Sequence, residues 1–288
     1  MITRLLFSYI ALVTPLLCAS ELDDSIAKAT TGDIAAQYAV ARAYYKGEGT
    51  ERDLAKAAVW FRKAAEQGDA KAQRLIATML VQGEGVEKNE REAFAWFQKS
   101  AAQGDALASA NLGWFYSQGI GTPKNMDEAI RHYRVAAKAG QLDAQVRLGQ
   151  ILTKGYDGVR EDYTEAAQYL TPAAEKGHAG AQNTLGVMLE EGLGVSKNLP
   201  EAVKWFRAAA EGGEPRAMMN LGRMYESGTA IPRDADQACK WFTLSADLKE
   251  DGALKYLASL LETKKITPEN VAAGRKLAAE YTAAKNAK

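Results

Sequence analysis

The feature that most constrains the fold of this chain is a pattern that recurs every 36 residues. Trp60 and Trp96 are 36 residues apart, and so are Trp205 and Trp241. Glycines keep the same period, at Gly32, Gly68, Gly104 and Gly140, followed by Gly177 after one step of 37 residues. A period of this size is typical of repeat proteins, in which each short unit buries its apolar side on its neighbours. We therefore predict an array of similar units instead of a globule around one central core.

Each unit is predicted to contain two helices. The first carries small and apolar residues at helical spacing, for example Ala181 and Leu185. Gly186 lies in the middle of this helix, where glycine costs about 1 kcal/mol relative to alanine, so we expect another helix to pass too close for a side chain. A Gly-x-Gly turn follows at residues 192–194, and the extra residue of the long step falls in the corresponding loop at residues 155–158.

The second helix of each unit has a well-defined start. An Asp or Asn suited to the N-cap precedes it, at Asp53, Asn89, Asn125, Asp162, Asn198 and Asp234. In five of these six cases a Glu or Gln follows three residues later, as Glu201 follows Asn198, which predicts a reciprocal capping box. An aromatic pair such as Trp205-Phe206 comes next, and its fixed period predicts one core slot that is the same in every unit.

Composition and motifs argue against several classes of function. Lys plus Arg and Asp plus Glu both number 36, so we expect no nucleic-acid partner. Neither His132 nor His178 has Asp, Glu or Cys at the spacing of a metal site, and no Gly-x-Ser-x-Gly elbow is present. We predict no metal, no cofactor and no catalytic residue, although a triad of residues far apart in sequence stays open. His132 is predicted to pack in a Trp position and His178 to lie solvated at a turn.

Residues 1–20 have the layout of a secretory signal peptide. Arg4 precedes an apolar stretch over residues 5–17, and small residues follow at 19–20. The stretch is too short for a confident membrane span, so we expect a periplasmic or secreted protein with no integral span after cleavage. Retention as an uncleaved anchor and lipidation at Cys18 stay open. If Cys18 is removed, Cys239 is the only cysteine left, so no internal disulfide can form, and we expect its thiol to be buried and inert.

The repeat pattern predicts the following organisation for the rest of the chain. Six repeats occupy residues 35–251. Residues 21–34 are predicted to form an N-terminal capping helix, equivalent to a lone second helix. Residues 252–288 are predicted to form a partial seventh repeat and a C-terminal capping helix, because the open ends of such arrays require polar caps.

The repeated unit follows the pattern Ala-x-x-x-Leu-Gly-x-x-Tyr-x-x-Gly-x-Gly-Val, then Asp or Asn, and then Glu-Ala-x-x-Trp-Phe-x-x-Ala-Ala-x-x-Gly. This pattern resembles the Sel-one-like repeat, a relative of the tetratricopeptide repeat. Residues 181–213 match it best. The resemblance implies an all-α fold, a right-handed superhelical solenoid of about six helix-turn-helix repeats, and a role as a partner-binding scaffold that is often exported in bacteria. The cysteine-rich branch of the family, associated with β-lactamase activity, has a disulfide in each repeat, which this chain lacks.

Solenoids of this kind usually turn their first helices toward a concave groove, so residues there that do not repeat are candidates for partner binding. The predicted set is Arg42, Lys71, Asn111, Trp114, Arg147, Gln150, Arg216, Asn220 and Arg223. Trp114 stands out because aromatic and Arg residues dominate binding hot spots. The alternatives are that Trp114 packs against a neighbouring helix and that the arginines are ordinary solvated surface.

The leading functional hypothesis is a non-catalytic scaffold of the bacterial envelope that binds an acidic or mixed segment of another protein in this groove. A second hypothesis is a periplasmic immunity protein that neutralises a secreted antibacterial enzyme. A third, from another class, is a β-lactam or cell-wall hydrolase.

Overall fold

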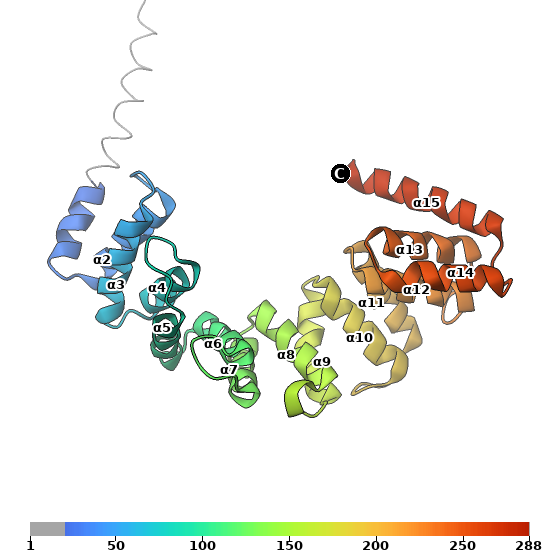
Figure 1. Ribbon diagram of the computed structural model, residues 1–288, viewed down its shortest axis with the longest axis horizontal. Helices are drawn as coiled ribbons and strands as arrows, with labels where there is room; N and C mark the ends of the chain where they lie inside the picture. Colours follow the sequence, from blue (N-terminus) through green and yellow to red (C-terminus); the bar gives the residue numbers. More distant parts are fainter. Residues whose placement is uncertain (1–20, 288) are drawn as a thin grey trace, which may run out of the picture. The chain divides into compact units, whose positions relative to one another are not determined.

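The computed structural model describes residues 21–287, and every regular element in that range is a helix (Figure 1). The proposed signal peptide lies outside the described residues. A first helix, α1, covers residues 21–30, and the chain then forms two compact units that divide between Gln141 and Leu142. None of the described helices is both long and apolar enough to cross a membrane.

The remaining helices alternate as the period predicts. First helices of the repeats are α2 (Ile34–Lys46), α4 (Ala70–Gln82), α6 (Ala106–Gln118), α8 (Leu142–Lys154), α10 (Ala179–Glu191), α12 (Pro215–Ser227) and α14 (Asp251–Glu262). Second helices are α3 (Leu54–Glu66), α5 (Glu90–Ala102), α7 (Met126–Lys138), α9 (Tyr163–Glu175), α11 (Leu199–Glu211) and α13 (Ala235–Asp247), and α15 (Pro268–Asn286) follows them. The extra residue of the fourth repeat lies in a short 3-10 turn, η1 (Tyr156–Gly158). The all-α solenoid is confirmed, while the handedness of its superhelix stays a prediction.

Side-chain caps set the helix starts. In all six second helices the predicted Asp or Asn accepts a hydrogen bond from the backbone amide three residues later, as Asn198 accepts from Glu201 (3.2 Å). The predicted second bond of the capping box, from the Asn198 backbone amide to the Glu201 side chain, is wrong for this pair. That backbone amide already donates to the Leu189 carbonyl of the preceding first helix (2.9 Å). The Glu201 carboxylate accepts from the Asn198 side chain instead (2.9 Å).

The core slot is occupied by the second member of each aromatic pair. Phe206 is fully buried on Gly186, where an added Cβ would lie 2.7 Å from the ring. This confirms the predicted close approach of the two helices. The prediction that the tryptophans share the core slot is wrong for Trp60 and Trp205, which are only partly buried. At Trp60 the Lys63 Nζ lies 4.2 Å from the centre of the indole ring, so the lysine covers its outer face.

Neighbouring repeats are joined through polar contacts and through the glycine turns. Gln73 of α4 is buried and donates to the Ala65 carbonyl at the end of α3 (3.1 Å). Gln37 of α2 donates in the same way to the Ala29 carbonyl of α1 (3.1 Å), so α1 occupies the place of a second helix. In the turn after α4, a Cβ on Gly85 would lie 2.2 Å from the Leu54 carbonyl oxygen, and only glycine allows this approach.

The C-terminal part departs from the repeat geometry. Helix α15 packs along α13, and no comparable contact joins it to α14 (Figure 1). Gly274 makes this packing possible, because a Cβ there would lie 2.4 Å from the Cβ of Cys239. The linker over residues 263–267 contains no glycine and is shorter than the corresponding linkers of the other repeats, so α15 starts earlier. Leu254 on α14 is 61% exposed.

Candidate partner-binding surface

The predicted partner-binding residues share three positions of the first helices. They occupy the second position (Lys71, Arg216), the sixth (Asn111, Arg147, Asn220) and the ninth (Arg42, Trp114, Gln150, Arg223). These positions are four and then three residues apart, so they lie on one face of each helix. We call this face the 2-6-9 face. The structure places the residues on it, and their role in binding stays a prediction.

In the first unit, α6 presents the most accessible aromatic residue of this face. Trp114 is 39% exposed and meets the Phe115 ring edge-on at 5.4 Å between centroids. Lys71 on α4 is exposed as well. The side-chain amide of Asn111 donates to the Leu107 carbonyl of its own helix (2.9 Å), so part of its hydrogen-bonding capacity is already used.

Arg42 of α2 lies beside an acidic group of the following turn. Its guanidinium is 3.4 Å from the Glu48 carboxylate, and Lys46 lies 3.3 Å from the other oxygen. The hydrogen bond from Lys46, with the charges of Lys46 and Arg42, lowers the pKa of Glu48. Both partners of the Arg42–Glu48 pair are about half exposed, so the pair adds little to stability.

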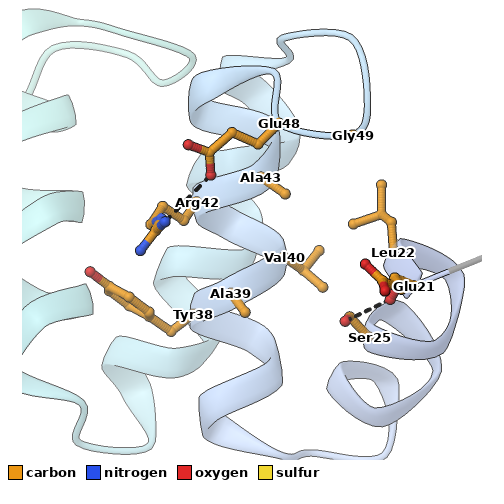
Figure 2. Close-up of a pocket in the computed structure, with 10 residues that line it drawn as sticks. All are labelled: Glu21, Leu22, Ser25, Tyr38, Ala39, Val40, Arg42, Ala43, Glu48 and Gly49. Carbon is orange, nitrogen blue, oxygen red and sulfur yellow. Dashed lines mark hydrogen bonds and ion pairs between the residues drawn. The ribbon is translucent and has the colours of Figure 1, made fainter. Parts of the chain in front are cut away.

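A cavity of about 490 Å³ lies between α1 and α2, next to Arg42 (Figure 2). Leu22 and Ser25 line it from α1, and Val40 and Ala43 point toward it from α2. This cavity was not predicted from the sequence. The signal was present in the repeat pattern, because Ser25 is the residue 36 positions before Phe61.

In the second unit, α12 carries three of the predicted residues on one face. Arg216 and Arg223 are exposed, and Arg216 lies 3.9 Å from Glu250. Asn220 instead donates to the side chain of Asn183 on α10 (3.0 Å), so it connects two first helices. Asn183 was not predicted from the sequence, because nothing in the repeat period identifies which residue of a neighbouring first helix Asn220 contacts.

A partly buried acid accompanies Arg223. Burial raises the pKa of Glu190 on α10, and the positive charge of Arg223 partly offsets this effect. Glu190 was not among the residues predicted for partner binding. On α8, Arg147 is exposed and Gln150 is partly buried.

The two histidines have structural contacts. His132 packs against the Tyr116 ring with 5.6 Å between centroids, which confirms that it packs in the Trp position. Burial, followed by the charge of Arg131, lowers its pKa. The prediction that His178 is a solvated turn residue is wrong, because its Nδ1 accepts from the Ala181 amide (3.1 Å) and caps α10. Within residues 21–287 no three His, Cys, Asp or Glu side chains are grouped so as to hold a metal ion.

Cys239 is buried, as predicted, and its surroundings keep the thiol protonated. Burial, together with the charge of Asp236, raises the pKa of this thiol to about 11. Because the thiolate is the reactive form, we expect the folded protein to protect Cys239 from alkylation.

Comparison with known proteins places the chain among repeat proteins. The Sel1 repeat matches six consecutive segments, residues 34–69, 70–105, 106–141, 142–178, 179–214 and 215–250. The crystal structure of a protective antigen present in uropathogenic Escherichia coli strains, which displays an SLR fold, is 32% identical with a TM-score of 0.74. The match covers 90% of this chain and 56% of that one, so the chain spans little more than half the length of that antigen.

Two further structures are similar over most of the chain. A Sel1 repeat protein from Oxalobacter formigenes is 32% identical with a TM-score of 0.61, over 80% of this chain and 96% of that one. An immunity protein from Pseudomonas aeruginosa is 23% identical with a TM-score of 0.38, over 74% of this chain and 81% of that one. A comparison with curated proteins gives no match.

Proposed function

Because the chain belongs to the Sel1 repeat family, whose members commonly mediate protein–protein interactions, we propose that it is a non-catalytic scaffold that binds another protein on the 2-6-9 face of its first helices. The observation that carries the proposal is the contrast between this face and the rest of each repeat. Caps, glycines and core rings recur from unit to unit, whereas the 2-6-9 face changes and supplies an exposed Trp and several exposed cations. Specific binding of one partner requires surface residues that differ from one repeat to the next.

The chemistry of the face indicates what kind of segment it binds. Arg147, Arg216 and Arg223 are exposed in the second unit, where they can form bidentate hydrogen bonds with carboxylates. Trp114 supplies a large apolar surface in the first unit. We therefore propose that the first unit binds an apolar anchor of the partner and that the second unit binds acidic side chains of the partner.

Affinity capture with matched variants tests this proposal. The tagged protein is incubated with envelope extract of the producing bacterium, and captured proteins are identified by mass spectrometry. We expect the double variant Trp114→Ala/Arg147→Ala to reduce capture of the specific partner at least tenfold. The control Val135→Ala/Lys204→Ala removes an exposed apolar residue and a cation from second helices, and it should retain capture. Equal capture by the two variants would reject the 2-6-9 face as the binding surface.

The proposed location in the envelope rests on the composition of residues 1–20. Cell fractionation and N-terminal sequencing of the mature chain test it, with a new N-terminus near residue 21 as the expected result. Recovery of the full-length chain in the cytosol would contradict export. A captured partner that is an enzyme, and that loses activity on binding, would indicate neutralisation as the purpose of the interaction.

A further inference from the structure

Two large buried residues recur in the interior of the array. One is the eighth residue of the second helix: Phe61, Phe97, Tyr133, Leu170, Phe206 and Phe242, all buried. The other is the tenth residue of a first helix: Met79, Phe115, Ile151, Met188, Met224 and Leu260, also buried. Between α5 and α6 the two are in direct contact, with 5.4 Å between the ring centroids of Phe97 and Phe115.

The contact between α1 and α2 lacks both large residues. Its alignment with the other repeats is fixed by the bond from Gln37 to the Ala29 carbonyl, which repeats the bond from Gln73 to the Ala65 carbonyl 36 residues later. In this alignment Ser25 of α1 corresponds to the large eighth residue of a second helix, and Ala43 of α2 corresponds to the large tenth residue of a first helix. Two small residues where the other repeats have large ones produce the cavity shown in Figure 2.

The walls of this cavity suit an apolar guest. Leu22 and Ala43, both partly exposed, present aliphatic groups to it, and Val40, which also lines it, is fully buried. The Ser25 hydroxyl donates to the Glu21 carbonyl of its own helix (2.8 Å), so it does not require a polar partner in the cavity. A group with the shape of the Phe97 ring would restore the packing that the α5–α6 contact has, and it would gain the free energy of removing apolar surface from water.

The rim of the cavity carries one carboxylate that is not ion-paired. Glu48 forms ion pairs with Arg42 and Lys46, whereas Glu21, which also lines the cavity, has no ion-pair partner among the described residues. A cation next to the guest ring would therefore find a carboxylate at the mouth of the cavity.

From these observations we propose that the cavity between α1 and α2 binds an aromatic side chain of a partner polypeptide that has a Lys or Arg beside the ring. The proposal rests on the proposed function in one respect, namely that the physiological ligand is a protein. It adds a second contact site of defined chemistry, which shares only Ala39 and Arg42 with the 2-6-9 face. The ring of the partner takes the place that Phe97 has in the α5–α6 contact.

Short peptides test the proposal without the physiological partner. The probes are acetylated and amidated Lys-Phe-Lys, Lys-Ala-Lys and Glu-Phe-Glu, and binding to the full chain is followed by NMR shifts of the Val40 and Ala43 methyl groups. We expect only Lys-Phe-Lys to shift both methyls in a saturable way. Equal shifts with Lys-Ala-Lys would overturn the aromatic part of the proposal, and equal shifts with Glu-Phe-Glu would overturn the charge part. No binding by any peptide would overturn the whole.

Variants that fill the cavity provide the second arm. Ser25→Phe and Ala43→Met install the residue types of the other repeats, so each should raise the melting temperature and weaken Lys-Phe-Lys binding at least tenfold. Ala27→Met makes the same substitution as Ala43→Met at an exposed site of α1 that does not line the cavity, and it should change neither. Unchanged peptide binding in a folded, filled variant would place the peptide elsewhere. Because no partner is needed, these results are independent of the capture experiment with Trp114 and Arg147.

Discussion

At the scale of single residues, stability is concentrated in a ring and the small residue beneath it. Phe206 is completely buried on Gly186, whereas the adjacent Trp205 is only partly buried, and its buried indole Nε1 has no hydrogen-bond partner among the described atoms. Truncation of a buried ring removes transfer free energy and leaves a cavity, and both terms are larger for a residue that is completely enclosed. The two neighbours in sequence therefore differ in their importance for the fold.

Phe206→Ala is predicted to cost about 3 to 5 kcal/mol of unfolding free energy, as is usual for a buried Phe. Trp205→Ala should cost clearly less, because part of its surface already contacts water and its Nε1 is released from an unsatisfied position. Urea unfolding followed by circular dichroism gives both values. Equal losses for the two variants would mean that the indole contributes as much to the core as the phenyl ring does.

His132 makes stability depend on pH. Its pKa in the folded protein is below the ordinary value near 6.5, chiefly because burial disfavours the charged ring. The unfolded chain then binds the proton more readily than the folded chain. The contribution of neutral His132 to the free energy of unfolding is therefore fully present above about pH 6.5, and it is lost as the pH falls through the lower pKa of the folded state. We expect His132→Trp, which installs the residue of the other repeats, to reduce the loss of urea midpoint between pH 7.5 and pH 5.5. The same loss of urea midpoint in the variant and in the unmodified protein would mean that titratable groups other than His132 cause it.

At the scale of helices, single side chains join one element to the next. Asp105 caps α6 through one carboxylate oxygen, which accepts from the Ala108 amide (2.8 Å). Its other oxygen accepts from Arg74 of α4 (3.0 Å), and both side chains are largely shielded from solvent. One carboxylate thus starts a helix and connects it to the preceding repeat.

Substitutions at Asp105 separate these two contributions. Asp105→Asn retains a good cap and loses the ion pair, whereas Asp105→Ala loses both and should cost about 1 kcal/mol more than Asp105→Asn. Asp69 is the matched control, because it caps α4 through Ala72 (2.7 Å) and has no ion-pair partner among residues 21–287. Asp69→Asn should leave the urea midpoint almost unchanged. A loss as large as that of Asp105→Asn would show that the bond to Arg74 contributes nothing.

At the scale of the whole molecule, packing is confined to helices that are near one another in sequence. The largest contacts join α13 to α15 and, within repeats, α2 to α3, α4 to α5, α6 to α7, α10 to α11 and α12 to α13, and the chain divides into two compact units. An array with nearest-neighbour contacts does not transmit damage uniformly, because each repeat interacts only with adjacent repeats.

Phe206→Ala should therefore act locally. Amide hydrogen exchange is predicted to accelerate in α10, α11 and α12, while α2 to α5 keep the protection of the unmodified protein. Mass spectrometry of proteolytic fragments resolves these segments. Uniform acceleration along the chain would indicate one cooperative unit.

Much of the fold was predictable because it repeats. Six copies of the same caps and glycines indicated where the helices start and which face they bury, and the structure confirms both. The return bond of the capping boxes could not be predicted, since the amide of Asn198 is occupied by a carbonyl of another helix. The docking of α15 on α13 could not be predicted, because it depends on the length of the linker over residues 263–267. This linker occurs once in the chain, so no other repeat shows what it does.

The candidate site was predictable only in part. Helical periodicity put the chosen residues on one face, and the exposure of Trp114 fits its selection. The internal bond of Asn220 depends on Asn183 in a different repeat, and the cavity beside Arg42 depends on Ser25 and Ala43 together. Such pairings are set by tertiary packing, which a pattern within one helix does not encode.

The five tryptophans also differ in ways that a spectrometer can detect. Trp96 and Trp241 are nearly inaccessible, each with a lysine ammonium within 4.5 Å of the indole centre, whereas Trp114 is 39% exposed. Indole emission shifts to longer wavelength as the ring meets water, so the signal of Trp114 should lie at the red edge. A bound partner that covers this ring would move the emission toward the blue, which makes the unlabelled protein an optical reporter of its own occupancy.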